Sequence, residues 1–166
     1  MPGQLAPVPM TEPSEQHHTL SCLLLPLAAG NLLLPNAAVV EVSAYPAAIE
    51  PVEHAPDWYA GRFRWRGLSL PLVEWERLMG QSATVDPDRR KSLAICHLFS
   101  ADAAALCMGL EISGLPRLLA LTQAGLQTQV DSAVPESCIL GAVRLQDTVA
   151  WIPDLDALGR MIVSFA

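Results

Sequence analysis

Cysteine and histidine carry much enzyme chemistry, and in this chain they are few and far apart. The cysteines show no Cys-x-x-Cys pair, and no glycine-rich phosphate-binding loop is present. His17 and His18 are adjacent but lack further ligands at metal-binding spacing, so two solvated histidines are the simpler interpretation. We therefore expect no metal, no cofactor and no catalytic site. A small enzyme that uses His97 or Cys138 is the alternative, although no local motif supports it.

Cys96 and Cys107 are the cysteines whose spacing allows a specific interaction. If residues 100–103 form a hairpin turn, the two thiols lie opposite each other, and a cross-strand disulfide is geometrically conceivable. Residues 1–19 lack the basic start and apolar core of a signal peptide, which favours a cytoplasmic protein with reduced, buried thiols. His97 alternates with Cys96 along the predicted strand, so we expect a half-exposed histidine that faces away from both thiols.

Two pairs of acidic residues could suggest general acid–base catalysis. They are Glu74 with Glu76, and Asp154 with Asp156. Each pair also begins a segment that predicts a short helix. Because acidic side chains interact favourably with the N-terminus of a helix, we prefer this structural explanation for both pairs.

Three basic residues, Arg62, Arg64 and Arg66, are interleaved with two aromatic ones. In a β-strand the arginines would share one face, while Phe63 and Trp65 would share the other. The segment is either an amphipathic strand with a solvated basic face or an arginine surface that pairs with an acidic partner.

Glu41 is the lone charge within the apolar segment 37–42. Because an isolated charge is costly to bury, its side chain either lies on the solvent face of a strand or is paired with an opposite charge. The sequence leaves both alternatives open.

The charge and hydropathy of the chain exclude two broad classes of function. Its net charge of −7 disfavours general nucleic-acid binding, which depends on clustered lysine and arginine. Although 51% of its residues are hydrophobic, no apolar run approaches the roughly 18 residues of a membrane-spanning helix. We therefore expect no direct membrane insertion. The 166 residues suffice for one domain or two small lobes.

A repeat with an offset of 80 residues indicates the elements that must position these side chains. Residues 61–79 align without a gap with residues 141–159, and the aligned pairs include Gly61 with Gly141, Arg64 with Arg144, and Leu72 with Ile152. Each copy predicts a strand, a tight turn, a second strand and the start of a short acidic helix. Such a repeat favours two similar β-subdomains, which suit a scaffold better than an enzyme.

The rest of the chain fits this division into two similar halves. Residues 1–18 contain four prolines and predict a flexible N-terminal tail, which leaves residues 19–166 for the domain. The first half predicts a hairpin over residues 20–27 and 32–34, a helical turn over residues 37–39 capped by Asn36, and a strand over residues 39–44. The second half predicts a hairpin over residues 92–99 and 103–110, a broken strand over residues 111–121, and a loop over residues 123–135.

The sequence thus predicts an all-β protein with short helices. Each half is too small to bury a good core alone. Two small β-barrels, packed side by side over a shared apolar seam, satisfy the pattern best.

Three short motifs, in this order and spacing, resemble a known family. They are Val39-Val-Glu-Val42, then Pro51 and Pro56 leading into Trp58-Tyr-Ala-Gly61, then Trp65-Arg-Gly-Leu-Ser-Leu-Pro-Leu-Val73. A valine/glutamate strand, a proline-bearing linker, a glycine, an Arg-Gly turn and a proline-containing strand are similar to the CheW-like domain of bacterial chemosensory systems. The resemblance extends from about residue 20 to residue 161.

The resemblance implies a fold of two five-stranded β-barrel lobes and a non-catalytic adaptor. Such adaptors couple chemoreceptors to the histidine kinase CheA, and they bind the kinase regulatory domain and the cytoplasmic tip of methyl-accepting chemoreceptors. Carried over by motif, the partner-binding residues are Val39, Glu41, Gly61, Arg64, Arg66 and Gly67, on or near a receptor-side groove between the lobes. Arg66 and Glu41 are expected to pair there.

The segment 32–36 looks like the divergent ChpC or PilI branch of the family. That likeness implies a role in type IV pilus (twitching) chemosensory arrays. A stand-alone interaction module that serves another regulator is the alternative function.

Overall fold

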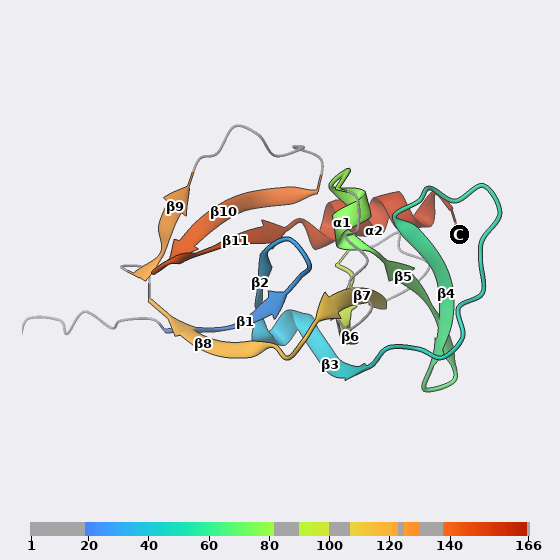
Figure 1. The fold of residues 1–166 in the computed structure, drawn as a ribbon, viewed down its shortest axis with the longest axis horizontal. Helices are drawn as coiled ribbons and strands as arrows, with labels where there is room; N and C mark the ends of the chain where they lie inside the picture. Colours follow the sequence, from blue (N-terminus) through green and yellow to red (C-terminus); the bar gives the residue numbers. More distant parts are fainter. Residues whose placement is uncertain (1–18, 82–89, 100–106, 123–124, 130–137, 166) are drawn as a thin grey trace, which may run out of the picture.

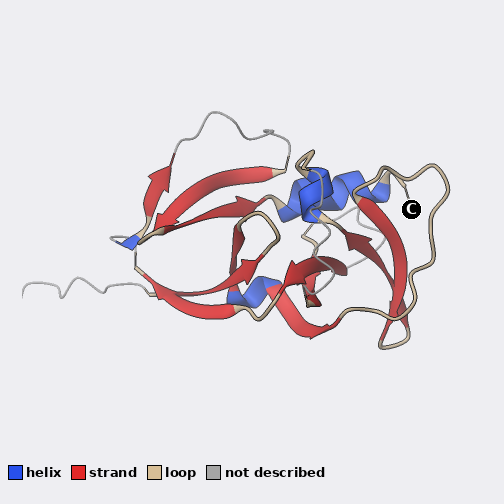
Figure 2. Ribbon diagram, in the orientation of Figure 1, coloured by secondary structure: helices blue, strands red, loops and turns tan. Residues whose placement is uncertain are grey.

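Short strands make up most of the protein, as Figure 2 shows. The computed structural model describes residues 19–81, 90–99, 107–122, 125–129 and 138–165. The strands are β1 Leu20–Pro26, β2 Asn31–Pro35, β3 Val39–Ala44, β4 Tyr59–Trp65, β5 Leu68–Val73, β6 Lys91–His97, β7 Cys107–Ser113, β8 Arg117–Leu121, β9 Gln127–Gln129, β10 Ile139–Leu145 and β11 Thr148–Pro153. The helices are the 3-10 turn η1 Asn36–Ala38, α1 Trp75–Leu78 and α2 Leu155–Val163.

The strands form two sheets, which we call the six-stranded lobe and the five-stranded lobe. The six-stranded lobe has the order β8-β1-β2-β11-β10-β9, and the five-stranded lobe has the order β3-β6-β7-β5-β4. Figure 1 shows the two lobes side by side along the long axis of the molecule. The all-β class with short helices and the two-lobed arrangement are therefore confirmed. Among the described residues, however, both sheets are open rather than closed barrels, and one has six strands.

The division of the chain between the lobes differs from the predicted succession of two halves. The N-terminal hairpin β1–β2 does not join the first copy of the repeat. It pairs instead with strands from the second half, through antiparallel β8 and parallel β11. The five-stranded lobe is consequently continuous in sequence, whereas the six-stranded lobe is assembled from both parts of the chain that flank it.

The repeat itself is confirmed in detail. Hairpins β4–β5 and β10–β11 are both antiparallel, and each is followed by a short helix. Each also has a register shift at the same place, between Tyr59 and Gly61 in the first copy and between Ile139 and Gly141 in the second. The two copies therefore share the bulge as well as the order of their elements.

One apolar core joins the two lobes, as the predicted seam requires. It contains buried leucines of β1 and β2, buried side chains of the five-stranded lobe, and the inner face of α2. Glu76 in α1 accepts a hydrogen bond of 2.5 Å from the backbone N–H of Ala28 in the β1–β2 turn, which links the helix of the first repeat to the other lobe. At the chain end, the Phe165 ring lies 5.9 Å from that of Trp58, beside the start of β4. The helix of the first repeat thus contacts the six-stranded lobe, and the segment that follows α2 contacts the residue that precedes β4.

Two local predictions need correction. The helical turn after β2 exists, but Pro35 occupies the N-cap position of η1 and the turn has no side-chain cap, so Asn36 does not cap it. The loop predicted over residues 123–135 contains strand β9, which pairs with β10 at the edge of the six-stranded lobe. The tail expected over residues 1–18 and the turn expected over residues 100–103 lie outside the described residues.

The N-cap of α2 gives a direct test of its contribution to stability. The Asp154 side chain accepts hydrogen bonds from the backbone N–H groups of Asp156 (3.1 Å) and Ala157 (2.9 Å). We expect Asp154→Ala to lower the free energy of unfolding by about 1 kcal/mol in urea titrations, because two helix-end donors lose their acceptor. Asp154→Asn, which keeps a capping oxygen, should lose much less. Equal losses in the two variants would contradict this assignment.

Candidate functional site

The predicted partner-binding residues centre on the tight turn between β4 and β5. Arg66 and Gly67 both have positive φ angles, of 47° and 81°, which is the geometry of a two-residue hairpin turn. The Arg66 guanidinium carbon lies 5.0 Å from the centroid of the Trp65 ring. A guanidinium of Arg66 also forms an ion pair with the Glu41 carboxylate, with an N–O distance of 2.5 Å.

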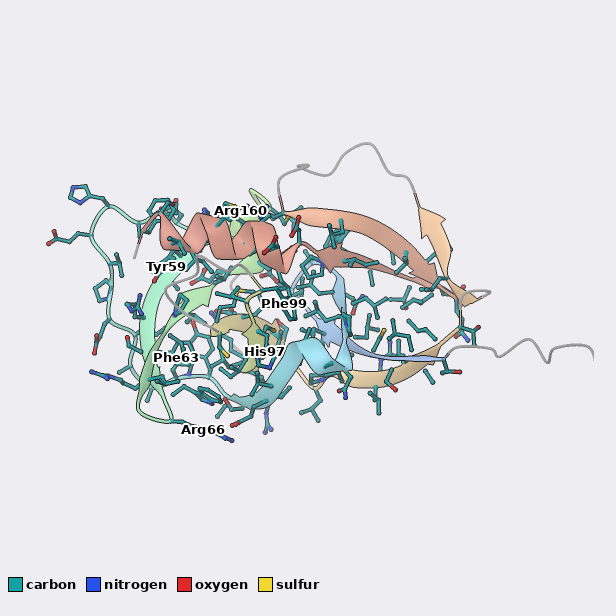
Figure 3. The ribbon with its side chains drawn as sticks, turned by 180° about the vertical axis from the view of Figure 1, so that it is seen from behind. Tyr59, Phe63, Arg66, His97, Phe99 and Arg160 are labelled. Atoms are coloured by element: carbon teal, nitrogen blue, oxygen red, sulfur yellow. The ribbon has the colours of Figure 1, made fainter. Side chains whose placement is uncertain are left out.

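This ion pair connects the two opposite edges of the five-stranded lobe. Glu41 lies in β3, which is one edge strand, and Arg66 follows β4, which is the other. A twisted sheet whose edges approach this closely is strongly curved. Figure 3 shows Arg66 at the end of the β4–β5 hairpin, close to the ribbon of β3. The pairing expected for Glu41 and Arg66 is therefore present in the structure.

The pair is a surface feature more than a source of stability. The Arg66 side chain is 68% exposed and that of Glu41 is 31% exposed. Ion pairs with this exposure contribute about 0–1 kcal/mol to folding. The contact orients both side chains, so that an ordered charge pair faces the solvent.

The three arginines do not form the single basic face that strict strand alternation predicts. Arg66 lies in the turn, where alternation ends. Arg62 donates to the Ser69 hydroxyl (3.0 Å) and backbone carbonyl (2.8 Å), so its charge is held along the hairpin. Arg64 is exposed, and the described residues provide it with no ion pair. The aromatic face was correctly predicted, since Phe63 is buried and Trp65 packs against the same core.

The remaining predicted site residues have backbone or packing roles. Val39 is partly buried against the core shared by the lobes. Gly61 has φ +136°, and a Cβ there would lie 2.4 Å from the Glu50 carbonyl oxygen, so only glycine fits. Gly67 faces open space at φ +81°. These three residues shape the surface but provide few side-chain contacts to a partner.

Two apolar residues beside Glu41 were missed by the sequence analysis. Val40 and Val42 are 39% and 38% exposed on edge strand β3. Alternation along residues 39–44 places these two valines on the face opposite to Glu41, but it does not predict that this face is exposed. They add an apolar surface to the edge that carries the ion pair.

The cysteine and histidine predictions were partly wrong. The register places Cys96 opposite Met108 and His97 opposite Cys107, one residue away from the predicted pairing. All four cysteines are free and buried, and no disulfide joins Cys96 to Cys107. The exposed His97 does not face away from Cys107, because its Nδ1 lies 3.8 Å from the Cys107 Sγ. Burial raises the pKa of the Cys107 thiol, which disfavours the reactive thiolate.

Each acidic pair has a structural role, but only Asp154 caps a helix N-terminus with its side chain, and Glu74 makes no cap hydrogen bond. Glu74 pairs with Arg77 at 2.5 Å, and burial is the main cause that raises the pKa of the Glu74 carboxyl. Asp156 pairs with Arg160 at 2.9 Å along α2. Glu76 and Asp154 accept the backbone hydrogen bonds described above. These contacts account for all four carboxylates without invoking catalysis.

Within the described ranges, no group of three or more His, Cys, Asp or Glu side chains could hold a metal ion. The helices of that part of the chain include none that is long and apolar enough to cross a membrane.

The two sheets, joined by one apolar core, define a two-lobed β-protein with short helices. A model of the CheW-like domain matches residues 21–162, and the chain belongs to the CheW-like domain family. Among solved structures, it is similar to the scaffolding protein TtCheW from Thermoanaerobacter tengcongensis, with a TM-score of 0.69 and 15% sequence identity, over 85% of this chain and 92% of that one. No curated protein sequence matches it.

Proposed function

We propose that this protein is a non-catalytic adaptor that couples chemoreceptors to a CheA-type histidine kinase. Its membership of the CheW-like family supports this function. The single observation that carries the proposal is the Glu41–Arg66 ion pair, because it orders the surface at which the resemblance puts the receptor contact. The likeness of segment 32–36 to the ChpC or PilI branch supports a type IV pilus array as the system.

The proposed receptor surface combines a charge pair with an apolar edge. Arg66 and Glu41 offer a donor and an acceptor of fixed direction. Arg64 adds a positive charge on the same hairpin and has no ion pair within the part of the chain that the structure describes. Val40 and Val42 supply exposed apolar area on the same edge strand β3, on the face opposite to Glu41. A receptor tip is a helical bundle, and a helix that presents both apolar and charged side chains is complementary to such a surface.

The first test is calorimetric titration of the full chain with the regulatory domain of the CheA-type kinase from the same organism. We expect saturable binding, which is typical of a kinase–adaptor contact. Binding to receptor tips without any binding to the kinase would instead favour a stand-alone interaction module. If the folded protein binds neither the kinase regulatory domain nor receptor tips, the adaptor proposal is overturned.

Arg66→Ala should weaken receptor binding without a large change in the stability of the fold. We expect at least a tenfold weaker affinity for a receptor-tip fragment, while the free energy of unfolding changes by about 1 kcal/mol or less because the pair is exposed. Affinity is measured by titration and stability by urea unfolding. Kinase binding is the internal control and should be unchanged.

A charge exchange provides the matched control for that variant. Glu41→Arg and Arg66→Glu should each weaken receptor binding, and the double variant should recover part of it by restoring the pair. Receptor affinity equal to that of the unmodified protein in Arg66→Ala would refute the role assigned to the pair.

A further inference from the structure

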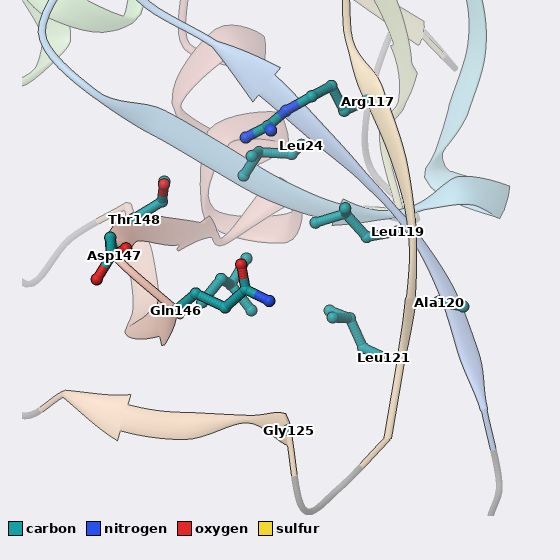
Figure 4. Close-up of a pocket in the computed structure, with 10 residues that line it drawn as sticks. Leu24, Arg117, Leu119, Ala120, Leu121, Gly125, Gln146, Asp147 and Thr148 are labelled. Atoms are coloured by element: carbon teal, nitrogen blue, oxygen red, sulfur yellow. The ribbon is translucent and has the colours of Figure 1, made fainter.

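A cavity of about 460 Å³ opens at the end of the six-stranded lobe (Figure 4). Its apolar wall consists of four leucines, from β1, β8 and β10: Leu24, Leu119, Leu121 and Leu145. All four belong to the small core of this lobe, and of these four leucines only Leu24 is fully buried, at 2% exposure. The volume is within the range of about 300–1,000 Å³ that is usual for small-molecule sites.

The internal repeat explains why this lobe has a cavity. In the five-stranded lobe, the large side chains of Phe63 and Trp65 fill the core beneath the β4–β5 hairpin. With the offset of 80 residues, Val143 and Leu145 occupy the same positions in β10. The second copy therefore places two much smaller side chains under an equivalent hairpin. Unfilled apolar space destabilises a fold, so an apolar occupant would be favourable there.

The polar groups of the cavity lie at its rim. Arg117, at the start of β8, is exposed, and none of the ion pairs among the described residues involves it. Figure 4 shows its side chain extending over Leu24, while the Gln146 amide points toward the leucines. Asp147 also lines the cavity, beside Thr148 and apart from Arg117 in the same view. An anionic group is thus accommodated only at the Arg117 end.

We propose that this cavity binds an amphipathic monoanion, namely an unbranched medium-chain carboxylate. The alkyl chain lies among the four leucines, and the carboxylate pairs with the Arg117 guanidinium, which matches its planar geometry. Gln146 adds a hydrogen-bond donor at the mouth. The site lies in the lobe opposite to the Glu41–Arg66 pair and does not depend on the adaptor function.

The test is calorimetric titration of the full chain with decanoate, and in parallel with decanol as the uncharged analogue. We expect saturable 1:1 binding of decanoate, and at least tenfold weaker binding of decanol. Arg117→Ala should weaken decanoate binding at least tenfold, since a charge-assisted hydrogen bond is lost. Arg144→Ala, an exposed arginine of the same lobe outside the cavity, is the matched control and should bind normally.

The filling variant is Leu145→Trp, which introduces the residue that the first repeat carries at Trp65. It should abolish decanoate binding while the protein stays folded, and Leu119→Phe is a second filling variant if the first does not fold. Absence of saturable binding by the unmodified protein would overturn the proposal. So would normal binding by a folded filling variant, or equal affinity for decanoate and decanol.

Discussion

Replacement of Gly61 by alanine is expected to lower the free energy of unfolding by about 3 kcal/mol or more. The new Cβ would lie 2.4 Å from the Glu50 carbonyl oxygen and 2.8 Å from the Ile49 Cγ2, and the φ of +136° is unfavourable for any side chain. Overpacking and backbone strain each cost about 1–3 kcal/mol, and both act at this position. Urea unfolding, followed by circular dichroism, measures the loss.

The repeat supplies the control for this prediction. Gly141 occupies the same place beside the bulge of the second hairpin, but a Cβ there would have no atom within 4 Å, and its φ lies outside the left-handed region. Gly141→Ala should therefore change stability by about 0.5 kcal/mol or less. If both alanine variants lose the same stability, the close approach of Gly61 to Glu50 is not what requires glycine. If Gly61→Ala alone is destabilised as expected, any loss of partner binding by this variant reflects the altered fold and not a lost direct contact.

Truncation of Trp75 should be the most costly change in the shared core. This α1 side chain is 1% exposed and packs between elements of both lobes. We expect Trp75→Ala to lose about 3–5 kcal/mol in the free energy of unfolding, the usual cost of removing a buried aromatic side chain. Thermal and urea denaturation, followed by circular dichroism, would measure this loss of stability.

Trp75→Phe distinguishes packing from hydrogen bonding at the same position. The indole Nε1 has no hydrogen-bond partner among the described residues, so replacement by phenylalanine removes volume without breaking a hydrogen bond to any of them. The loss should be well below that of the alanine variant, at about 1.5 kcal/mol or less. Comparable losses in the two variants would show that the indole N–H, and not the packed volume, is what stabilises this region.

Local features of the fold could be predicted from the sequence, and nonlocal ones could not. Strand alternation and turn residues identify β1–β2, β4–β5 and β10–β11, because a hairpin is specified by residues close in sequence. The parallel pairing of Leu32 with Trp151 has no such signal, since it joins segments more than a hundred residues apart. The assignment of the first hairpin to the second lobe was missed for this reason. Strand β9 was missed because its three residues are polar and lie at a sheet edge.

At the candidate site, too, local features could be predicted from the sequence and nonlocal contacts could not. The pairing of Glu41 with Arg66 was anticipated from the family resemblance, and nothing in the spacing of these residues alone indicates it. Alternation correctly placed Phe63 and Trp65 in the core, but it failed at Arg66, where the turn reverses the chain. The offset of one residue at Cys96 arose because hairpin register depends on turn length, which the sequence of residues 100–106 does not specify.

The interleaved topology also constrains how the chain acquires its structure during synthesis. Strands β3 to β7 are contiguous, so all partners of the five-stranded lobe have left the ribosome once residue 113 has emerged. The first hairpin, although made earliest, must wait for β8 and β11 before its leucines are covered on both sides. Its apolar surface is therefore exposed longest on the nascent chain, where unpaired strands are prone to aggregate and chaperones act.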